Sequence, residues 1–221
     1  MYLETLINHE IPALSATQTI EEALGIMRDF FVAELPFVEN GHLVALVDED
    51  TLLDAPDALA AVSEAVTLKG SPVVMATAHP YEAACRMAEF KLSLLPVIGE
   101  EQQFLGVITR HDLFQYLFEP ATGLAFPGAV VVLSMKPSDY SLSEIARICE
   151  SCDTTVLNVQ IFSAPQDERM DVVLKTNKQD LQTLRAAFER FEYNVREIFG
   201  AQADEGNLIE RYRLLMNYIN M

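Results

Sequence analysis

Residues 71–113 read SPVVMATAHPYEAACRMAEFKLSLLPVIGEEQQFLGVITRHDL, and this stretch decides the fold because the chain contains it twice. Residues 11–52, IPALSATQTIEEALGIMRDFFVAELPFVENGHLVALVDEDTL, repeat its order of polar and apolar positions. Identical residues recur sixty positions apart, as in Pro12 and Pro72, Met27 and Met87, or Leu35-Pro36 and Leu95-Pro96. A repeat of this period indicates a duplicated supersecondary unit.

The residue pattern of each copy predicts an extended piece, a helix, two short strands joined by a Gly-containing turn, and a second helix. The extended pieces are 11–14 and 72–75, and the strands are 35–38 with 43–47 and 94–98 with 104–108. Apolar residues at helical spacing predict the buried helix faces, which are Ile20, Ala23, Leu24 and Met27 in the first copy and Ala83, Ala84, Met87 and Phe90 in the second. One such β-α-β-β-α unit leaves its sheet half covered, so we expect the two copies to pack their sheets together.

The stretch from Glu119 to Gly128 contains two prolines and two glycines, which predicts a domain boundary. Beyond it the pattern reads strand 129–135, helix 141–150, strand 156–162, strand 170–176, helix 178–191 and strand 195–199. This βαββαβ order is typical of a ferredoxin-like sandwich. We therefore expect an α+β chain with a first repeat at 1–65, a second at 66–122 and a third domain at 128–200.

A terminal segment follows at 205–221, with apolar residues at helical spacing. Its stripe is Leu208, Tyr212, Leu215, Met216 and Ile219. A stripe on a short helix must pack against something, and the sequence leaves open whether that is its own subunit or a second chain.

The composition excludes several classes of partner. The formal charge of −18 and the pI near 4.4 argue against nucleic acid, because phosphate backbones require clustered Lys and Arg. The start Met1-Tyr2-Leu3-Glu4 lacks the basic and apolar regions of a signal peptide, and no segment has the apolar length of a membrane helix. We expect a cytoplasmic protein without a membrane partner.

The sharpest chemical motif is Gly106-Val107-Ile108-Thr109-Arg110-His111-Asp112, a strand that runs into a helix start. Free N–H groups and the positive end of a helix dipole suit a phosphate there. Asp112 could accept hydrogen bonds from a cis-diol, and Arg110 could contact further phosphates. The same spacing is also that of a capping box, which satisfies the helix start and binds nothing else.

This motif, preceded by the strand Leu95-Pro96-Val97-Ile98 and repeated in tandem, resembles a pair of CBS domains. The resemblance implies that the Thr109 hydroxyl binds a phosphate and that the Asp112 carboxylate accepts hydrogen bonds from the ribose hydroxyls of an adenine nucleotide. Gly106 belongs to the same motif, and Val73, Val74 and Met75 are candidate walls for the adenine, although they could equally be core. The implied effector is AMP, ADP, ATP, S-adenosylmethionine or a cyclic dinucleotide, and no cofactor is required.

The first copy departs from this pattern. Asp48 stands where Thr109 stands, Thr51 stands where Asp112 stands, and Ala45 replaces the glycine. A carboxylate at the phosphate position repels a phosphate. We therefore expect either a single competent nucleotide site in each chain or, in addition, a weaker second site at Asp48 and Thr51 for an uncharged nucleoside-like ligand.

Residues 128–200 resemble an ACT domain, a ferredoxin-like module that often binds amino acids at a subunit interface. The loops Pro137-Ser138-Asp139-Tyr140-Ser141 and Asp153-Thr154-Thr155 lack the glycines of amino-acid-binding members. The resemblance therefore favours pairing or signal transmission for this domain. A CBS pair followed by an ACT domain is also the layout of regulatory proteins of the acetoin-utilisation protein B type.

Other reactive residues give weaker signals. Cys149-Glu150-Ser151-Cys152 could be a redox pair or half a metal site, but zinc needs four ligands, so buried small residues are the simpler interpretation. The carboxylates of Asp48, Glu49 and Asp50 could bind a divalent cation, but a solvated loop face is the usual explanation of such a run. We expect no metal site and no catalytic residues.

The sequence thus predicts a homodimeric regulatory protein that binds an adenosyl effector and acts on a protein target. A ligand-free interaction module that uses its acidic surface is the alternative, and an enzyme with Cys149 or Cys152 as nucleophile is a weaker one.

Overall fold

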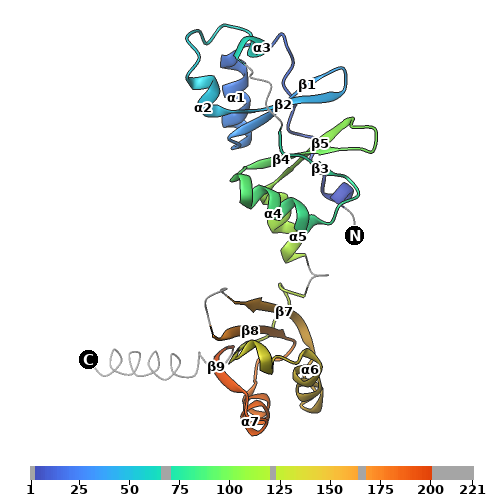
Figure 1. The fold of residues 1–221 in the computed structure, drawn as a ribbon, viewed down its shortest axis with the longest axis vertical. Helices are drawn as coiled ribbons and strands as arrows, with labels where there is room; N and C mark the ends of the chain where they lie inside the picture. The colour runs from blue at the N-terminus through green and yellow to red at the C-terminus, as the bar shows by residue number, and fades with distance from the viewer. Residues whose placement is uncertain (1–2, 66–70, 120–122, 164–167, 201–221) are drawn as a thin grey trace, which may run out of the picture. The chain divides into compact units, whose positions relative to one another are not determined.

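The computed structural model describes residues 3–65, 71–119, 123–163 and 168–200 (Figure 1). The chain divides into two compact units, Met1–Tyr116 and Leu117–Met221. The first unit contains both repeats, and the second contains the βαββαβ segment.

The two repeats share one order of elements. The first comprises α1 (Ile20–Phe30), β1 (Glu34–Glu39), β2 (His42–Asp48) and α2 (Glu49–Leu53); η1 (Leu3–Leu6) precedes it and the short α3 (Val62–Ala65) follows it. The second comprises β3 (Val74–Met75), α4 (Pro80–Phe90), β4 (Leu94–Ile98), β5 (Phe104–Thr109) and α5 (Arg110–Phe118).

The strands of the second repeat form a three-stranded sheet in the order β3-β4-β5. β3 runs parallel to β4 with Val74 opposite Val97, and β5 runs antiparallel to β4 with Thr109 opposite Leu94. In the first repeat β1 and β2 form the matching hairpin, and the third strand is reduced to a parallel bridge between Leu14 and Phe37. The predicted strands are confirmed.

Local sequence explains where the long helices begin and end. Thr19 caps α1 through a reciprocal capping box with Glu22, whereas α4 begins at Pro80, a residue suited to the first helical position. Both helices end at a residue in the left-handed region, Phe31 or Lys91. The predicted buried faces are largely confirmed, but Phe90 is 51% exposed. Phe90 lies in the last turn, where the helix has already passed the edge of the core.

The N-terminal residues of the chain pack on the second repeat and not on the first. The amides of Leu3 and Glu4 donate to the carbonyls of Ala78 and Ala76, and Leu3 is fully buried in the core of the second repeat. Figure 1 shows η1, in dark blue, beside this part of the chain. Further along, Asn8 and Val107 exchange backbone hydrogen bonds of 2.7 and 3.2 Å.

The converse crossing occurs after the first repeat. The amide of Leu46, the residue that corresponds to Val107, donates to the Ser71 hydroxyl over 2.8 Å. Each repeat therefore forms hydrogen bonds with the segment that precedes the other repeat. Sequence periodicity alone does not predict this exchange.

The second unit has the predicted βαββαβ order. Its elements are β6 (Val130–Met135), η3 (Pro137–Asp139), α6 (Leu142–Ser151), β7 (Val156–Phe162), β8 (Met170–Thr176), α7 (Gln182–Arg190) and β9 (Asn194–Phe199). The sheet order is β7-β8-β6-β9 and every pairing is antiparallel, which is the ferredoxin-like arrangement.

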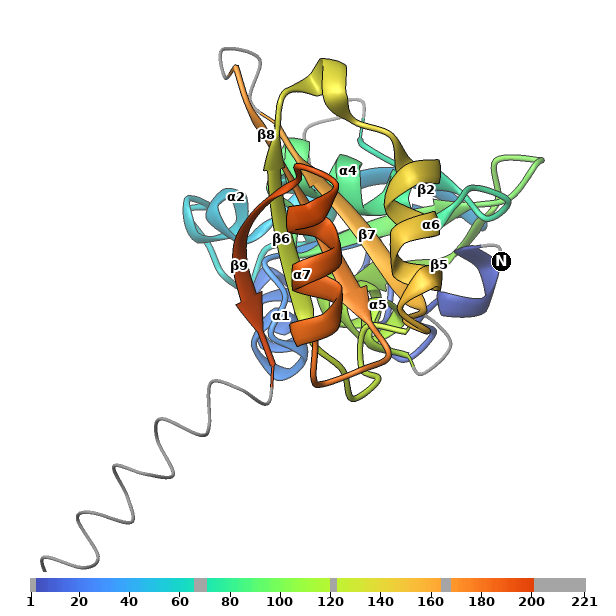
Figure 2. The ribbon, with the colours of Figure 1, turned by 90° about the horizontal axis from the view of Figure 1, so that it is seen from below.

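The helices α6 and α7 cover one face of this sheet (Figure 2). Buried residues from both layers form its core, including Val131, Leu133, Ile145, Leu174 and Phe188. The prediction that α7 begins at Lys178 is wrong, because the Asp180 side chain accepts from the Gln182 amide and ends an irregular turn before the helix. The predicted terminal helix at 205–221 lies outside the described residues.

Candidate functional site

The helix start of the second repeat is held by a reciprocal capping box. The Asp112 amide donates to the Thr109 hydroxyl oxygen over 3.1 Å, and the Thr109 amide donates to Asp112 Oδ2 over 2.9 Å. The Thr109 hydroxyl also donates to Asp112 Oδ2, over 2.7 Å. The motif that predicted a phosphate site is therefore, in this structure, a complete cap.

The cap uses only one of the two carboxylate oxygens of Asp112. Both bonds to the carboxylate are accepted by Oδ2, so Asp112 Oδ1 takes part in neither of them. Asp112 is half-buried, whereas Thr109 is buried. Capping and ligand binding are compatible here, because a diol can donate to Oδ1 while Oδ2 keeps the helix start in place.

Arg110 has a structural role that the sequence did not predict. Its Nε donates to the Leu92 carbonyl over 2.6 Å, and its Nη2 donates to the Lys91 carbonyl over 2.8 Å. Lys91 ends α4, so the guanidinium satisfies carbonyls that a helix leaves unpaired at its C-terminus. Its remaining N–H groups alone could reach a phosphate.

Gly106 is required by the crossing of the N-terminal segment. A Cβ at this position would lie 2.5 Å from Ile7 Cγ2 and 3.0 Å from the Asn8 carbonyl oxygen. Its φ of +147° also disfavours any residue with a side chain. The glycine therefore permits close packing, whatever else it does for a ligand.

The predicted adenine walls divide into core and partly exposed residues. Val74 is 1% exposed and belongs to the core of the second repeat, whereas Val73 and Met75 keep partial exposure. β4 separates this segment from Thr109, with an offset from Leu94 to Val97 of about 10 Å along the strand. The structure thus places Val74 mainly in the core and leaves Val73 and Met75 as candidate contacts.

The weaker site in the first repeat is also a cap. Asp48 Oδ1 accepts from the Thr51 amide over 2.7 Å at the start of α2. The carboxylate and the hydroxyl have exchanged places relative to Thr109 and Asp112, yet the helix begins in the same way.

The two helix starts meet at a junction that the sequence analysis missed. The Glu49 amide at the start of α2 donates to the Ala33 carbonyl, and the Arg110 amide at the start of α5 donates to the Ser93 carbonyl. Ala33 and Ser93 occupy equivalent positions, and the Ala33 amide donates to the Ser93 hydroxyl over 2.8 Å. The contact between Ala33 and Ser93 therefore connects the helix start of the first repeat with that of the second.

A buried carboxylate completes this junction. Glu34, 8% exposed, accepts through Oε2 from the Ser93 amide over 2.9 Å and from the Ser93 hydroxyl. The signal in the sequence was a glutamate at the head of an apolar strand, where the second repeat has Leu94. Ser93, whose carbonyl accepts from the Arg110 amide, thus connects the carboxyl group of Glu34 to the start of α5.

Cys149 of the Cys-x-x-Cys motif is buried. Burial, with a smaller contribution from Cys152, raises the pKa of the Cys149 thiol to about 11. A thiol with so high a pKa stays protonated near neutral pH and is a poor nucleophile. No group of three or more metal-binding side chains occurs among the residues that the structure describes.

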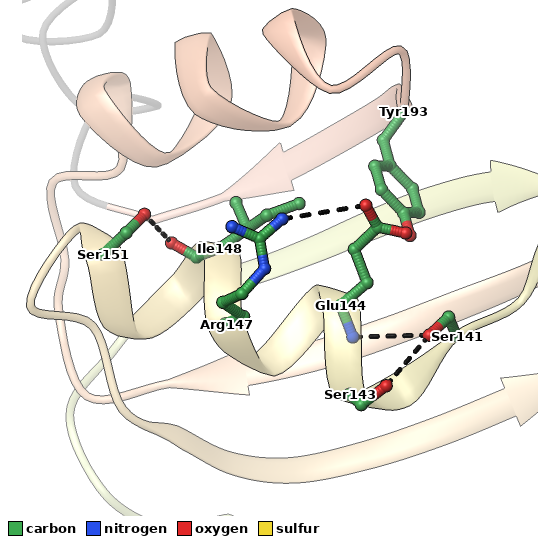
Figure 3. A network of polar contacts seen from close by, with 7 residues as sticks. All are labelled: Ser141, Ser143, Glu144, Arg147, Ile148, Ser151 and Tyr193. Carbon is green, nitrogen blue, oxygen red and sulfur yellow. Dashed lines mark hydrogen bonds and ion pairs between the residues drawn. The ribbon is translucent and has the colours of Figure 1, made fainter.

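The C-terminal unit contains a polar network along α6 (Figure 3). Ser141 caps the helix by accepting from the Glu144 amide, and Glu144 in turn accepts from the Tyr193 hydroxyl over 3.1 Å. Burial and this hydrogen bond raise the pKa of Tyr193 to about 12. Glu144 and Tyr193 line a cavity of about 390 Å³ beside η3. Lys136, Asp139 and Arg169 also line this cavity.

The family is established by a match to the model described as "CBS domain", which covers residues 3–58 and 62–119. The chain belongs to the CBS-domain family. The matched ranges coincide with the two repeats, so the predicted tandem CBS pair is confirmed. Such pairs are regulatory modules, and adenosyl ligands are their common effectors.

Individual relatives match over the CBS pair or a similar length. An inosine-5'-monophosphate dehydrogenase of Korarchaeum cryptofilum is 29% identical over 111 residues, which are 50% of this chain and 23% of the relative. A CBS domain pair/ACT domain protein of Thermotoga maritima is 26% identical with a TM-score of 0.48, covering 54% of this chain and 98% of that one. A putative acetoin utilization protein of Vibrio cholerae is 22% identical with a TM-score of 0.47, covering 53% and 90%.

These matches set the limits of what is established. The chain spans less than a quarter of the dehydrogenase, so that enzyme's activity is not transferred. The family match ends at residue 119, so the ACT resemblance of the second unit stays a prediction supported by its topology. None of the helices within the described residues has the length and apolarity that a membrane span requires.

Proposed function

We propose that the CBS pair binds an adenosyl effector at the α5 start and that the C-terminal unit pairs subunits or transmits the signal. The observation that carries the proposal is the Thr109 and Asp112 pair, which follows a buried strand and leaves Asp112 Oδ1 outside the cap. In this proposal Oδ1 accepts from the ribose hydroxyls, and Thr109 with the free N–H groups of Arg110 faces the phosphate.

The residues around the site favour an effector of low negative charge. Arg110 already serves the carbonyls at the end of α4, and Glu34 places a carboxylate at the junction. Like charges at short range repel strongly where water is excluded. We therefore rank AMP and S-adenosylmethionine above ATP and ADP as effectors, and we expect the Asp48 site to exclude phosphates.

A thermal-shift panel with AMP, ADP, ATP and S-adenosylmethionine tests this proposal, because a ligand of the native state raises the melting midpoint. The decisive variant is Asp112→Asn, which keeps one oxygen for the cap but removes the charge and the second acceptor. Asp48→Asn is the matched control at the first repeat. A shift that survives Asp48→Asn and disappears in Asp112→Asn is the expected result.

An equal response of both variants would contradict the proposed site. A flat panel would favour the other candidate function, an interaction module without a ligand. One observation supports that alternative: the cap by itself accounts for the hydrogen bonds between Thr109 and Asp112. The net charge of −18 would then favour a basic protein partner.

We also propose that the protein works as a homodimer, since modules of this kind transmit a signal by shifting between two arrangements. Light scattering at micromolar concentration measures the mass directly. The mass of a single chain, 24.7 kDa, would contradict this part of the proposal and leave ligand binding untouched.

A further inference from the structure

The sheet of the C-terminal unit has one face that its own helices leave uncovered. α6 and α7 pack on the same side, where alternate residues such as Val131 and Leu174 are buried (Figure 2). Residues that alternate with these point to the opposite side. Val130, Val132 and Val173 lie there, and each is half-buried.

On this opposite side a diagonal line of apolar residues crosses the sheet. Polar residues flank it, including Glu197 opposite Val132 and Gln160 opposite Val173. Val132 and Val173 lie directly opposite each other on the two central strands. Phe199 lies opposite Val130, and Phe162 lies opposite Asp171 next to Val173. We call these five apolar residues the open face: Val130, Val132, Phe162, Val173 and Phe199.

The two phenylalanines show that the open face lacks a complete cover. Phe162 is 59% exposed and Phe199 is 54% exposed within the described structure. A hollow of about 740 Å³ adjoins Phe162 and is also lined by Ser134, Asp171 and Arg196. The two phenylalanines lie on the two edge strands, at opposite ends of the apolar line that the valines connect. A continuous apolar surface with exposed members commonly packs against another segment.

The chain itself supplies a segment suited to this surface. β9 is an edge strand that ends at Phe199, a member of the open face, and the described residues end one position later at Gly200. Residues 201–221 follow from that point. Their sequence begins with the polar stretch AQADEGN and continues with the apolar stripe formed by Leu208, Tyr212, Leu215, Met216 and Ile219.

The lengths of the segment and of the sheet agree. Seven extended residues reach about 23 Å, enough to turn from the end of β9 back over the sheet. A helix over residues 208–221 would be about 21 Å long. β6 has six residues and is about 20 Å long. Glu210, Arg213 and Asn217 would lie on the side of that helix opposite the stripe.

We propose that residues 208–221 form an amphipathic helix that packs its stripe on the open face of the same chain. A helix of this length is marginal in water, so it needs the packing that the open face provides. Tethering through seven residues gives the tail a high effective concentration at its own sheet, which favours this occupant over a second copy. The ferredoxin-like unit would then have helices on both faces of its sheet.

A tryptophan reporter in the full chain tests the proposal, because the sequence contains no tryptophan. Tyr212→Trp puts the reporter in the stripe, and Asn217→Trp puts it on the opposite side of the predicted helix as the matched control. We expect Tyr212→Trp emission at shorter wavelength and severalfold weaker quenching by acrylamide than in Asn217→Trp. Equal emission and quenching in the two variants would overturn the proposal.

Two further substitutions identify the surface that the tail covers. Val173→Asp or Val132→Lys, each combined with Tyr212→Trp, should move the emission to longer wavelength while circular dichroism shows an intact fold. Neither valine belongs to the core under α6 and α7, so the fold should tolerate both changes. Emission that stays at shorter wavelength in both variants would place the tail elsewhere and overturn the proposal.

A mixing experiment separates the chain's own tail from that of a second copy. Chains carrying Tyr212→Trp and Val173→Asp are mixed with excess wild-type chains, whose open faces are intact. Emission that remains at longer wavelength is expected if each tail serves its own sheet. Recovery of the short-wavelength emission would show that the tail packs on a second copy, against the proposal.

Discussion

The helix starts of the two CBS repeats use the same residue types in opposite order. In the first repeat Asp48 is the capping residue and Thr51 follows three residues later, whereas in the second Thr109 caps and Asp112 follows. Both arrangements satisfy amides at a helix start, because an oxygen acceptor is all that the cap needs. Helix capping is therefore indifferent to the exchange.

What differs is the chemistry that each start presents to a ligand. The second repeat combines a hydroxyl at the cap with a carboxylate oxygen left outside it, and it has Arg110 next in sequence. The first repeat has Asp48, Glu49 and Asp50 in a row. The duplication thus kept the backbone and its hydrogen bonds while the electrostatics of the two candidate sites diverged. The comparison can be tested by exchanging single residues between the repeats.

The largest expected effect is at the glycine that lacks a counterpart. Gly106→Ala should destabilise the protein by about 3 kcal/mol, because the new Cβ meets Ile7 and the Asn8 carbonyl and the backbone is strained. Ala45→Gly, the reverse exchange in the first repeat, should cost about 1 kcal/mol. Chemical denaturation measures both, and equal losses would mean that the N-terminal crossing contributes little.

The junction between the repeats should give the next largest effect. Ser93→Ala removes the hydroxyl that links Ala33 and Glu34, which leaves a buried carboxylate with fewer partners and costs about 2 kcal/mol. Ala33→Ser at the equivalent, exposed position should change stability by less than about 0.5 kcal/mol. The denaturant midpoints of the two variants measure both effects. An unchanged midpoint in Ser93→Ala would contradict a stabilising role for the junction.

The guanidinium that caps α4 should matter less. Arg110→Ala leaves the carbonyls of Lys91 and Leu92 to water and should cost about 1 kcal/mol. Glu49 occupies the corresponding position with an exposed side chain, so Glu49→Ala should lie within about 0.5 kcal/mol of the parent. Thermal denaturation of both variants decides, and a larger loss for Glu49→Ala would reverse the assignment.

The smallest effect is expected from exchanging the caps themselves. The double variant Asp48→Thr with Thr51→Asp recreates the order of the second repeat and should change stability by less than about 0.5 kcal/mol, because a cap remains. The single variant Asp48→Ala should cost about 1 kcal/mol by comparison. Calorimetry of the two measures the difference, and a double variant as unstable as Asp48→Ala would show that the two starts are not interchangeable.

Much of the fold could be predicted from the sequence because its signals are local. The apolar spacing at Ile20, Ala23 and Met27 and the turns between the strands determined which elements form, and the duplication determined that they form twice. The same reasoning predicted the βαββαβ order of the second unit. It failed at Phe90 and at the start of α7, where the edge of the core and the Asp180 turn decide.

The candidate site could be predicted in position but not in its surroundings. Thr109 and Asp112 stood out because their spacing is itself a local signal. The roles of Arg110, Gly106 and Glu34 depend on segments far away in the chain: the end of α4, the residues before the first repeat, and Ser93. No pattern within a single repeat contains that information.

The sequence by itself determined the elements, their duplication and the chemical identity of the two helix starts, since periodicity and capping act over a few residues. The tertiary structure decided which residues those starts would have as neighbours. It brought Ala33 against Ser93 and the N-terminal segment against Gly106, because burying the apolar faces of two half-covered sheets requires each repeat to pack on the other.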